Sequence, residues 1–199
     1  QLLNEVEGQL RIGASVGMGH EVLKPVLGQF MLQYPAINLQ LNLLNRHVDL
    51  IEEGFDLVIR IGELKDSRLI AKHLGKISRT IYASPEYIKR HGDIQRIEQI
   101  NQADFLLMSS IQNSGRLLLE SGEEQHELKL TPKMQVDDFG ILKQMAIEAV
   151  GVAIIPDYMC QQQLANGQLI QVLPSWGMPD VDVYALYPKH RLNIPKVKA

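Results

Sequence analysis

Residues 13–17 read G-A-S-V-G and match the G-x-S-x-G pattern of serine hydrolases. In those enzymes the pattern places a serine on a strained turn between a strand and a helix, beside a backbone oxyanion hole. Ser15 would follow the first strand of this chain, so no earlier loop could supply the second oxyanion donor. None of the downstream histidines occupies a recognisable triad position. We therefore expect no catalysis and an ordinary turn at Ser15, with a serine hydrolase as an alternative.

The spacing of the glycines, histidines and cysteine disfavours a cofactor or a metal. Residues 17–22 form a truncated dinucleotide fingerprint, in which Val22 stands where a third glycine would allow close packing of helix on strand. Asn45 and Arg46 follow the second expected strand, where a ribose-binding acid would stand. The six histidines and the single cysteine are dispersed, without the short spacings of a zinc site. We predict neither a cofactor nor metal ligands.

Small and polar residues follow several expected strands, at the points where a helix or loop begins. They lie at 15–19, 45–46, 62–63, 109–110 and 137–138. In open α/β sheets, ligands bind outside the carboxyl ends of the strands. Helix N-termini there offer free N–H groups and a partial positive charge, worth about 0.3–1 kcal/mol each to an anion. These residue types favour binding without chemistry, although each residue taken singly is also explained as an ordinary turn residue.

The elements that must position these residues alternate between strand and helix. In the first part of the chain we predict strands at 9–14, 39–44 and 55–61, and helices at 23–34 and 47–53. The first helix rests on apolar residues at the spacing of one helical face, and Pro35 ends it. Strand, helix, strand, helix, strand is typical of a parallel sheet flanked by helices.

A second series follows. We predict strands at 69–74, 77–83, 105–108, 152–155, 169–173 and 181–187, and a hairpin with arms at 116–120 and 126–130. Helices are expected from Ser84-Pro85 to Gly92, from Asp137-Asp138 to Gly151, from a cap at Asp157 to Gly167, and from Pro195 onward. The two series predict two α/β lobes, with the last strand and helix returning to the first lobe.

Composition excludes several classes of protein. The chain has 199 residues, of which 45% are hydrophobic and 22% charged, as is typical of soluble globular domains. It has no run of about 18 apolar residues, so we expect no membrane partner. Its formal net charge of −3 disfavours direct binding of nucleic acid, which usually needs a basic face. The single Cys160 excludes an internal disulfide, and a start at Gln1 predicts a fragment of a longer chain or a processed product.

Nine segments, taken in their order and spacing, are specific to one family. They include GQLRI at 8–12, VDLIEEGFDLVIRIG at 48–62, ASPEYIKRHG at 83–92 and GVAIIPD at 151–157, together with 23–35, 66–75, 167–176, 184–188 and 195–199. Through these segments the chain resembles the effector-binding (regulatory) domain of LysR-type transcriptional regulators, and the resemblance covers nearly all of it.

The resemblance implies an α/β fold of two Rossmann-like lobes joined by two crossover strands, similar to periplasmic binding proteins. Lobe I would comprise residues 1–79 and 184–199, and lobe II residues 80–183. A winged helix-turn-helix DNA-binding domain would precede Gln1, so DNA would be bound only through that part. Members of the family are bacterial, cytoplasmic regulators that dimerise through this domain and form tetramers when full-length.

A small-molecule effector of unknown identity would bind in the cleft between the lobes, and would control the conformation of the DNA-bound oligomer and transcription. By position, the resemblance implies a pocket lined by Ser15, Val16, Gly17, Asn45, Gly62, Glu63, Ser109, Asp137 and Asp138. The chief alternative is a solute-binding protein of a transporter, which has the same two-lobe fold. The sequence upstream of Gln1 would distinguish the two.

Several of these positions depart from close relatives in the family. Ser15 stands where that branch commonly has Pro, Gly17 where it has Ser, and Asn45 where Asp is usual. Asp137 and Asp138 would add two carboxylates near the cleft, and these would repel an anionic effector. The family's usual effectors are carboxylates, so a neutral or cationic effector, or a proton, becomes an alternative.

Overall fold

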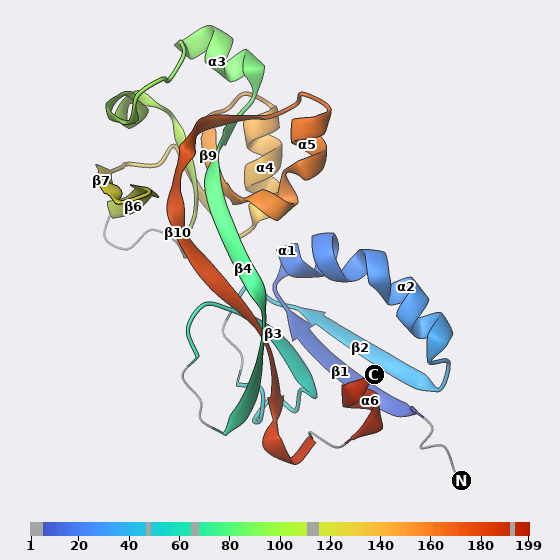
Figure 1. Cartoon of the computed structure of the whole chain (residues 1–199). Helices are drawn as coiled ribbons and strands as arrows, with labels where there is room; N and C mark the ends of the chain where they lie inside the picture. The colour runs from blue at the N-terminus through green and yellow to red at the C-terminus, as the bar shows by residue number, and fades with distance from the viewer. Residues whose placement is uncertain (1–5, 47–48, 65–67, 111–115, 192–193) are drawn as a thin grey trace. The chain divides into compact units, whose positions relative to one another are not determined.

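Figure 1 presents the computed structural model of the chain, which describes residues 6–46, 49–64, 68–110, 116–191 and 194–199. The chain divides into two compact units. Unit 1 contains Gln1–Lys76 and Val181–Ala199, and unit 2 contains Ile77–Asp180. The divisions between these units fall at 76/77 and 180/181, whereas the family resemblance implied lobe boundaries at 79/80 and 183/184.

Unit 1 is built on a sheet with the strand order β2-β1-β3-β10. Its strands are β1 (Gly8–Ala14), β2 (Ile37–Leu43), β3 (Leu57–Ile61) and the C-terminal part of β10 (Ile170–Pro188). β1 is parallel to both β2 and β3, and Ala14 lies opposite Leu43. β10 runs antiparallel to β3. The predicted parallel sheet is therefore confirmed, and the carboxyl ends of β1, β2 and β3 lie at one edge of it.

A helical segment connects β1 to β2 (Figure 1). It consists of α1 (Val16–Met18), a π-helical turn (Gly19–Leu23) and α2 (Lys24–Gln33), so it begins before the predicted start at residue 23. Gly19 in the π turn packs closely on β2, where a Cβ would displace the side chain of Leu43. No residue of α2 is buried, and Val26 and Leu32 are 54% and 85% exposed. The apolar face expected of this helix is thus largely outside the core.

The short helix expected at 47–53 is wrong for the part that the structure describes. Residues 47 and 48 lie outside the described residues, and 50–54 form a hydrogen-bonded turn. The N–H of Glu53 donates to the carbonyl of Asp49 at 2.9 Å, and the N–H of Phe55 returns to Leu50 at 3.0 Å. Gly54 closes the turn with a φ of +72°, which favours glycine. The buried side chains of Leu50 and Phe55 anchor the turn in the core of unit 1.

Unit 2 contains the strand order β4-β9-β5-β8. The strands are β4 (Leu69–Ala83), which begins in unit 1, β9 (Val152–Pro156), β5 (Phe105–Met108) and β8 (Met134–Val136). β5 is parallel to β8 and β9, and β4 is antiparallel to β9. Every residue of β5 and β9 is buried, as is usual for parallel strands covered on both faces.

The first two helices of unit 2 begin close to their expected positions. The helices of this unit are α3 (Pro85–His91), α4 (Phe139–Ile147) and α5 (Gln161–Ala165), with 3-10 turns at Ile97–Gln102 and Asp157–Met159. Ser84 caps α3 as predicted, because its Oγ accepts the N–H of Tyr87 at 3.2 Å. Leu142 and Ala146 place one face of α4 in the core.

The predicted hairpin is confirmed as β6 (Arg116–Ser121) and β7 (Glu124–Lys129), which pair antiparallel. Leu117, Leu119 and Leu128 are buried, and they belong to the larger core cluster of unit 2. Gly122 at the tip has a φ of +61°. The hairpin is therefore packed into unit 2 by one of its faces.

Two long strands contribute residues to both units. The expected strands at 69–74 and 77–83 form the single 15-residue β4, and those at 169–173 and 181–187 belong to the single 19-residue β10. Gly75 does not interrupt β4, and the prolines within β10 do not divide it. These are the two crossover strands of the expected two-lobe α/β class, which is confirmed.

The chain ends with a 3-10 turn (Lys189–Arg191) and α6 (Pro195–Lys198), so the helix expected from Pro195 is confirmed. Lys196 on α6 donates a hydrogen bond to the carbonyl of Gln9 on β1. Among the described residues, no helix has both the length and the apolar character needed to cross a membrane.

Candidate functional site

The loops that follow β1 and β2 meet at the carboxyl edge of the unit 1 sheet. Ser15 is the N-cap of α1, and its Oγ accepts the N–H of Met18 at 3.3 Å. The side-chain oxygen of Asn45 accepts the N–H of Val16, also at 3.3 Å. Just before these loops, the N–H of Leu44 donates to the carbonyl of Ala14 at 2.8 Å. The structure therefore brings together three of the expected pocket residues, and Gly17 lies beside them in α1.

An ion pair holds the loop that carries Asn45. The guanidinium of Arg46 meets the carboxylate of Glu53 through two contacts, Nη1 to Oε1 at 2.9 Å and Nη2 to Oε2 at 2.8 Å. The hydrogen bond from Arg46 lowers the pKa of Glu53 below its ordinary value, and the same bond raises the pKa of Arg46. Because this pair is exposed, its contribution to overall stability is small. Its two-point geometry joins Arg46 specifically to the turn before β3.

Gly62 and Glu63 follow β3, the third parallel strand of unit 1. Gly62 has a φ of +91°, and its N–H donates to the carbonyl of Asp182 on β10 at 2.9 Å. Glu63 is exposed beside it. Since β3 is parallel to β1, both residues lie at the same edge of the sheet as Ser15 and Asn45.

The remaining expected residues lie at the carboxyl edge of the unit 2 sheet. Ser109 follows β5, and its N–H donates to the carbonyl of Val136 at the end of β8 at 2.9 Å. Asp137 and Asp138 follow β8. Asp138 caps α4 as predicted, because its Oδ1 accepts the N–H of Ile141 at 2.9 Å. One Asp138 oxygen is thus already bonded within its own helix, whereas Asp137 is exposed.

Asp157 gives this edge a cluster that we did not expect from the sequence. We expected Asp157 to cap a helix, which is wrong: residue 156 is the N-cap position, and no side chain caps the turn. Instead, Oδ1 of Asp157 accepts from Oγ1 of Thr80 at 2.7 Å, from the N–H of Thr80 at 3.2 Å and from the hydroxyl of Tyr82 at 2.9 Å. Gln171 donates to Oγ1 of Thr80 at 3.1 Å.

This polar cluster is built into the crossover strands, because Thr80 and Tyr82 lie on β4 and Gln171 lies on β10. Burial raises the pKa of Tyr82, so its hydroxyl stays protonated and donates to Asp157. The one feature of the sequence that could have indicated this cluster is the position of Asp157, an acid directly after the wholly apolar strand β9.

The described residues show no arrangement for nucleophilic or metal chemistry. The hydroxyl of Ser15 is used as a helix cap, and within the described ranges no histidine is hydrogen-bonded to it. The same part of the chain contains no group of three or more His, Cys, Asp and Glu side chains that could hold a metal ion. Cys160, the single cysteine of the chain, is buried.

Parallel sheets with polar residues at their carboxyl edges, connected by two long strands, define the class of two-lobe α/β ligand-binding domains. Within that class, residues 3–199 match the model of the LysR substrate binding domain, and the chain belongs to this family.

Curated relatives and solved structures agree with this assignment. The chain is 32% identical to an HTH-type transcriptional regulator of Xanthomonas campestris, over 100% of this chain and 59% of that protein. It is also 32% identical to the HTH-type transcriptional regulator DmlR of Escherichia coli, over 96% of this chain and 62% of DmlR. The full-length structure of the Vibrio cholerae virulence activator AphB matches with a TM-score of 0.87 and 27% identity, over 97% of this chain and 66% of AphB.

The chain therefore spans less than two thirds of the length of these relatives. They are named as transcriptional regulators, and AphB is described as a member of the LTTR protein family. The family assignment favours a regulator domain over the solute-binding protein of a transporter.

Proposed function

We propose that this chain is the ligand-sensing regulatory domain of a LysR-type transcription regulator, and that it binds a small effector without transforming it. The observation that carries this proposal is the hydrogen bond between Asn45 and Val16, which joins two polar loops at the carboxyl edge of a parallel sheet. That edge is where open α/β sheets bind ligands. The hydroxyl, amide and backbone groups present there can bind a ligand.

The proposed effector contacts are the nine residues implied by the family resemblance: Ser15, Val16, Gly17, Asn45, Gly62, Glu63, Ser109, Asp137 and Asp138. The carboxylates of Glu63, Asp137 and Asp138 favour a neutral or cationic effector over an acid. An effector would act by binding one conformation of the domain more tightly than another, because only differential affinity shifts an equilibrium.

For the whole protein, we propose a cytoplasmic homodimer or tetramer that binds DNA through a helix-turn-helix domain outside this chain. The names of the relatives support the DNA-binding part. The apolar residues left exposed on α2, Val26 and Leu32 among them, support a partner surface on unit 1. We also propose that lobe I comprises residues 1–79 and 184–199, and that lobe II comprises residues 80–183.

A thermal-shift screen of small metabolites against this chain tests the proposal. The panel should contain carboxylates, neutral compounds and amines, each measured at several pH values. A true effector at 100 times its dissociation constant adds roughly 2.7 kcal/mol of stability. If one chemical class raises the melting temperature and Asn45→Ala removes the effect, the proposed site is supported. A hit that stabilises Asn45→Ala and wild type equally places the ligand elsewhere.

A further inference from the structure

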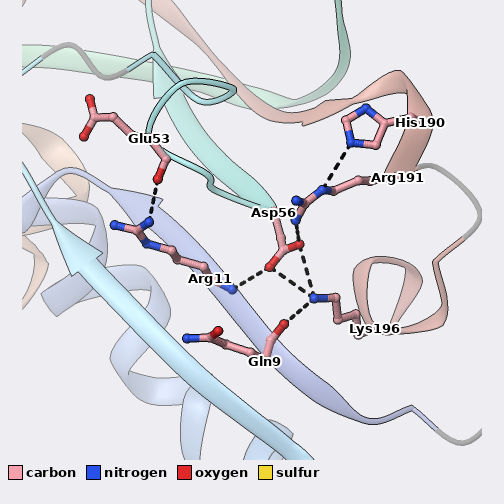
Figure 2. A network of polar contacts seen from close by, with 7 residues as sticks. All are labelled: Gln9, Arg11, Glu53, Asp56, His190, Arg191 and Lys196. Atoms are coloured by element: carbon pink, nitrogen blue, oxygen red, sulfur yellow. Dashed lines mark hydrogen bonds and ion pairs between the residues drawn. The ribbon is translucent and has the colours of Figure 1, made fainter.

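Asp56 is a buried carboxylate in unit 1, directly before β3, and its side chain is 4% exposed. Its oxygens receive donors from both ends of the chain (Figure 2). The backbone N–H of Arg11 donates to Oδ2 at 2.8 Å, the guanidinium of Arg191 donates to Oδ1, and Nζ of Lys196 lies 3.3 Å from Oδ1. An unpaired buried charge is costly, so the carboxylate depends on these partners.

The C-terminal residues are thereby fixed to strand β1. Nζ of Lys196 donates to the carbonyl of Gln9 as well as approaching Asp56. The N–H of Asp56 donates in turn to the carbonyl of Arg11 at 2.8 Å, so Asp56 and Arg11 exchange two hydrogen bonds. A displacement of the Asp56 carboxylate therefore acts on the main chain of Arg11.

The side chain of Arg11 carries this connection to the turn before β3. Its Nη1 donates to the carbonyl of Glu53 (Figure 2). Its guanidinium carbon lies 4.6 Å from the ring centroid of Phe55. The cation–π contact and the hydrogen bond together hold Arg11 in one orientation.

From Glu53 the contacts continue to the candidate site. The carboxylate of Glu53 holds the guanidinium of Arg46 at two points, and Arg46 follows Asn45 directly in the sequence. Asn45 accepts the N–H of Val16. We call this path from the C-terminal cations to Asn45 the unit 1 relay. Its members are Asp56, Arg11, Glu53 and Arg46.

We propose that Arg191 and Lys196 act through the unit 1 relay as positioning residues for the loop that carries Asn45. The C-terminal end of the chain would then be a regulatory element of the candidate site, although it does not contact the effector. The coupling between these two residues and the loop does not depend on the proposed function. The proposed function supplies only the role of the loop, which is to contact the effector. The links are hydrogen bonds and ion pairs, apart from the peptide bond that joins Asn45 to Arg46, and measured coupling is what establishes such a path.

The test compares Lys196→Met with Lys198→Met by 1H–15N NMR of the whole chain. Both lysines lie on α6, and both substitutions remove one ammonium group while keeping an unbranched side chain. Lys198 is exposed at the end of the helix and serves as the matched control. We expect the amide signals of Val16 and Asn45 to move in Lys196→Met and to stay in place in Lys198→Met. We also expect the amide hydrogens of Glu53 and Phe55 to exchange with solvent at least about threefold faster in Lys196→Met than in wild type.

Arg46→Gln defines the position of the Val16 signal when the relay is cut. In Lys196→Met the Val16 signal should move from its wild-type position toward its position in Arg46→Gln. In the double variant Lys196→Met/Arg46→Gln it should coincide with the signal of Arg46→Gln alone. Shifts confined to Gln9, Arg11 and Asp56 in Lys196→Met would overturn the proposal. If Lys196→Met does not fold, Arg46→Gln reads the same coupling in reverse, because coupling is reciprocal. Unchanged α6 amide signals in Arg46→Gln would then contradict it. No ligand is added, so failure of effector binding leaves this result intact.

Discussion

The side-chain oxygen of Asn45 accepts a hydrogen bond from the backbone N–H of Val16 at 3.3 Å and joins the loops that follow β1 and β2. One of these loops leads into α1, and the other is held by the ion pair between Arg46 and Glu53. The bond makes the two loops one polar surface at the edge where α/β sheets bind ligands.

Asn45→Ala removes this bond and one amide group of the proposed site. Because the residue is exposed, we expect the free energy of unfolding to change by no more than about 0.5 kcal/mol. Affinity for a compound identified by the thermal-shift screen should fall about tenfold, which is roughly 1.4 kcal/mol. Isothermal titration calorimetry measures both affinities. Asn38→Ala, also exposed but at the other end of β2, is the matched control and should bind like wild type.

Ser15→Ala should destabilise the chain by about 1 kcal/mol, because the hydroxyl that caps α1 is lost. Ser15→Thr keeps a hydroxyl cap and should lose less. Chemical denaturation measures both values. Wild-type protein should also resist labelling by a fluorophosphonate, since Ser15 acts as a cap and no histidine among the described residues is hydrogen-bonded to it. Labelling of Ser15 at a stoichiometric level would contradict this reading and restore the hydrolase alternative.

Asp138→Asn separates the cap of α4 from the charge near the site. The amide oxygen of asparagine can still accept the N–H of Ile141, so we expect little change in stability, whereas Asp138→Ala should cost about 1 kcal/mol. If the effector is a cation, Asp138→Asn should weaken its binding severalfold. If the effector is an acid, the same change should tighten binding. Equal affinities of wild type and Asp138→Asn would show that Asp138 does not face the effector.

The pKa of Glu53 should respond to Arg46. In the folded chain the hydrogen bond from Arg46 lowers this pKa. The stability that the ion pair contributes is therefore present above the ordinary pKa of a glutamate, and it is lost as the pH falls through the lowered value. A 13C titration of the Glu53 carboxyl should show its pKa rising toward the ordinary value in Arg46→Gln. An unchanged pKa in that variant would mean that the pair does not persist in solution.

Asp157→Ala should destabilise unit 2 by about 2–3 kcal/mol, because the donors of Thr80 and Tyr82 are left without their acceptor. Urea denaturation followed by circular dichroism measures the loss. Glu123→Ala, at the exposed tip of the β6–β7 hairpin, is the control and should stay within about 0.5 kcal/mol of wild type. If Asp157→Ala lowers the free energy of unfolding no more than the control does, the hydrogen bonds of the cluster do not stabilise unit 2.

The strand and helix order could be predicted because local signals agree with the tertiary structure. The caps at Ser84 and Asp138 are set by neighbouring residues, so both appear in the sequence. The unbroken paths of β4 and β10 could not be predicted, since Gly75 and the prolines of β10 act as breaks in a local pattern. Pairing with neighbouring strands keeps these segments extended.

The candidate site could be predicted only in part, because local sequence patterns do not contain contacts between distant residues. Ser15 and Asn45 could be placed at one edge because parallel strands align their carboxyl ends. The bond between Asn45 and Val16 depends on side-chain orientation, and the role of Asp157 depends on Thr80, which lies 77 positions earlier in the chain. A pattern confined to neighbouring residues contains neither relationship.

The most direct test of effector binding is a 1H–15N NMR titration of the labelled chain with the compound that gives the largest thermal shift in the screen. The proposed function predicts saturable shifts of the Ser15, Val16 and Asn45 signals with a single dissociation constant. In Asn45→Ala, the Ser15 and Val16 signals should not reach saturation at the same concentrations. Saturable shifts that leave these three residues unchanged would contradict it.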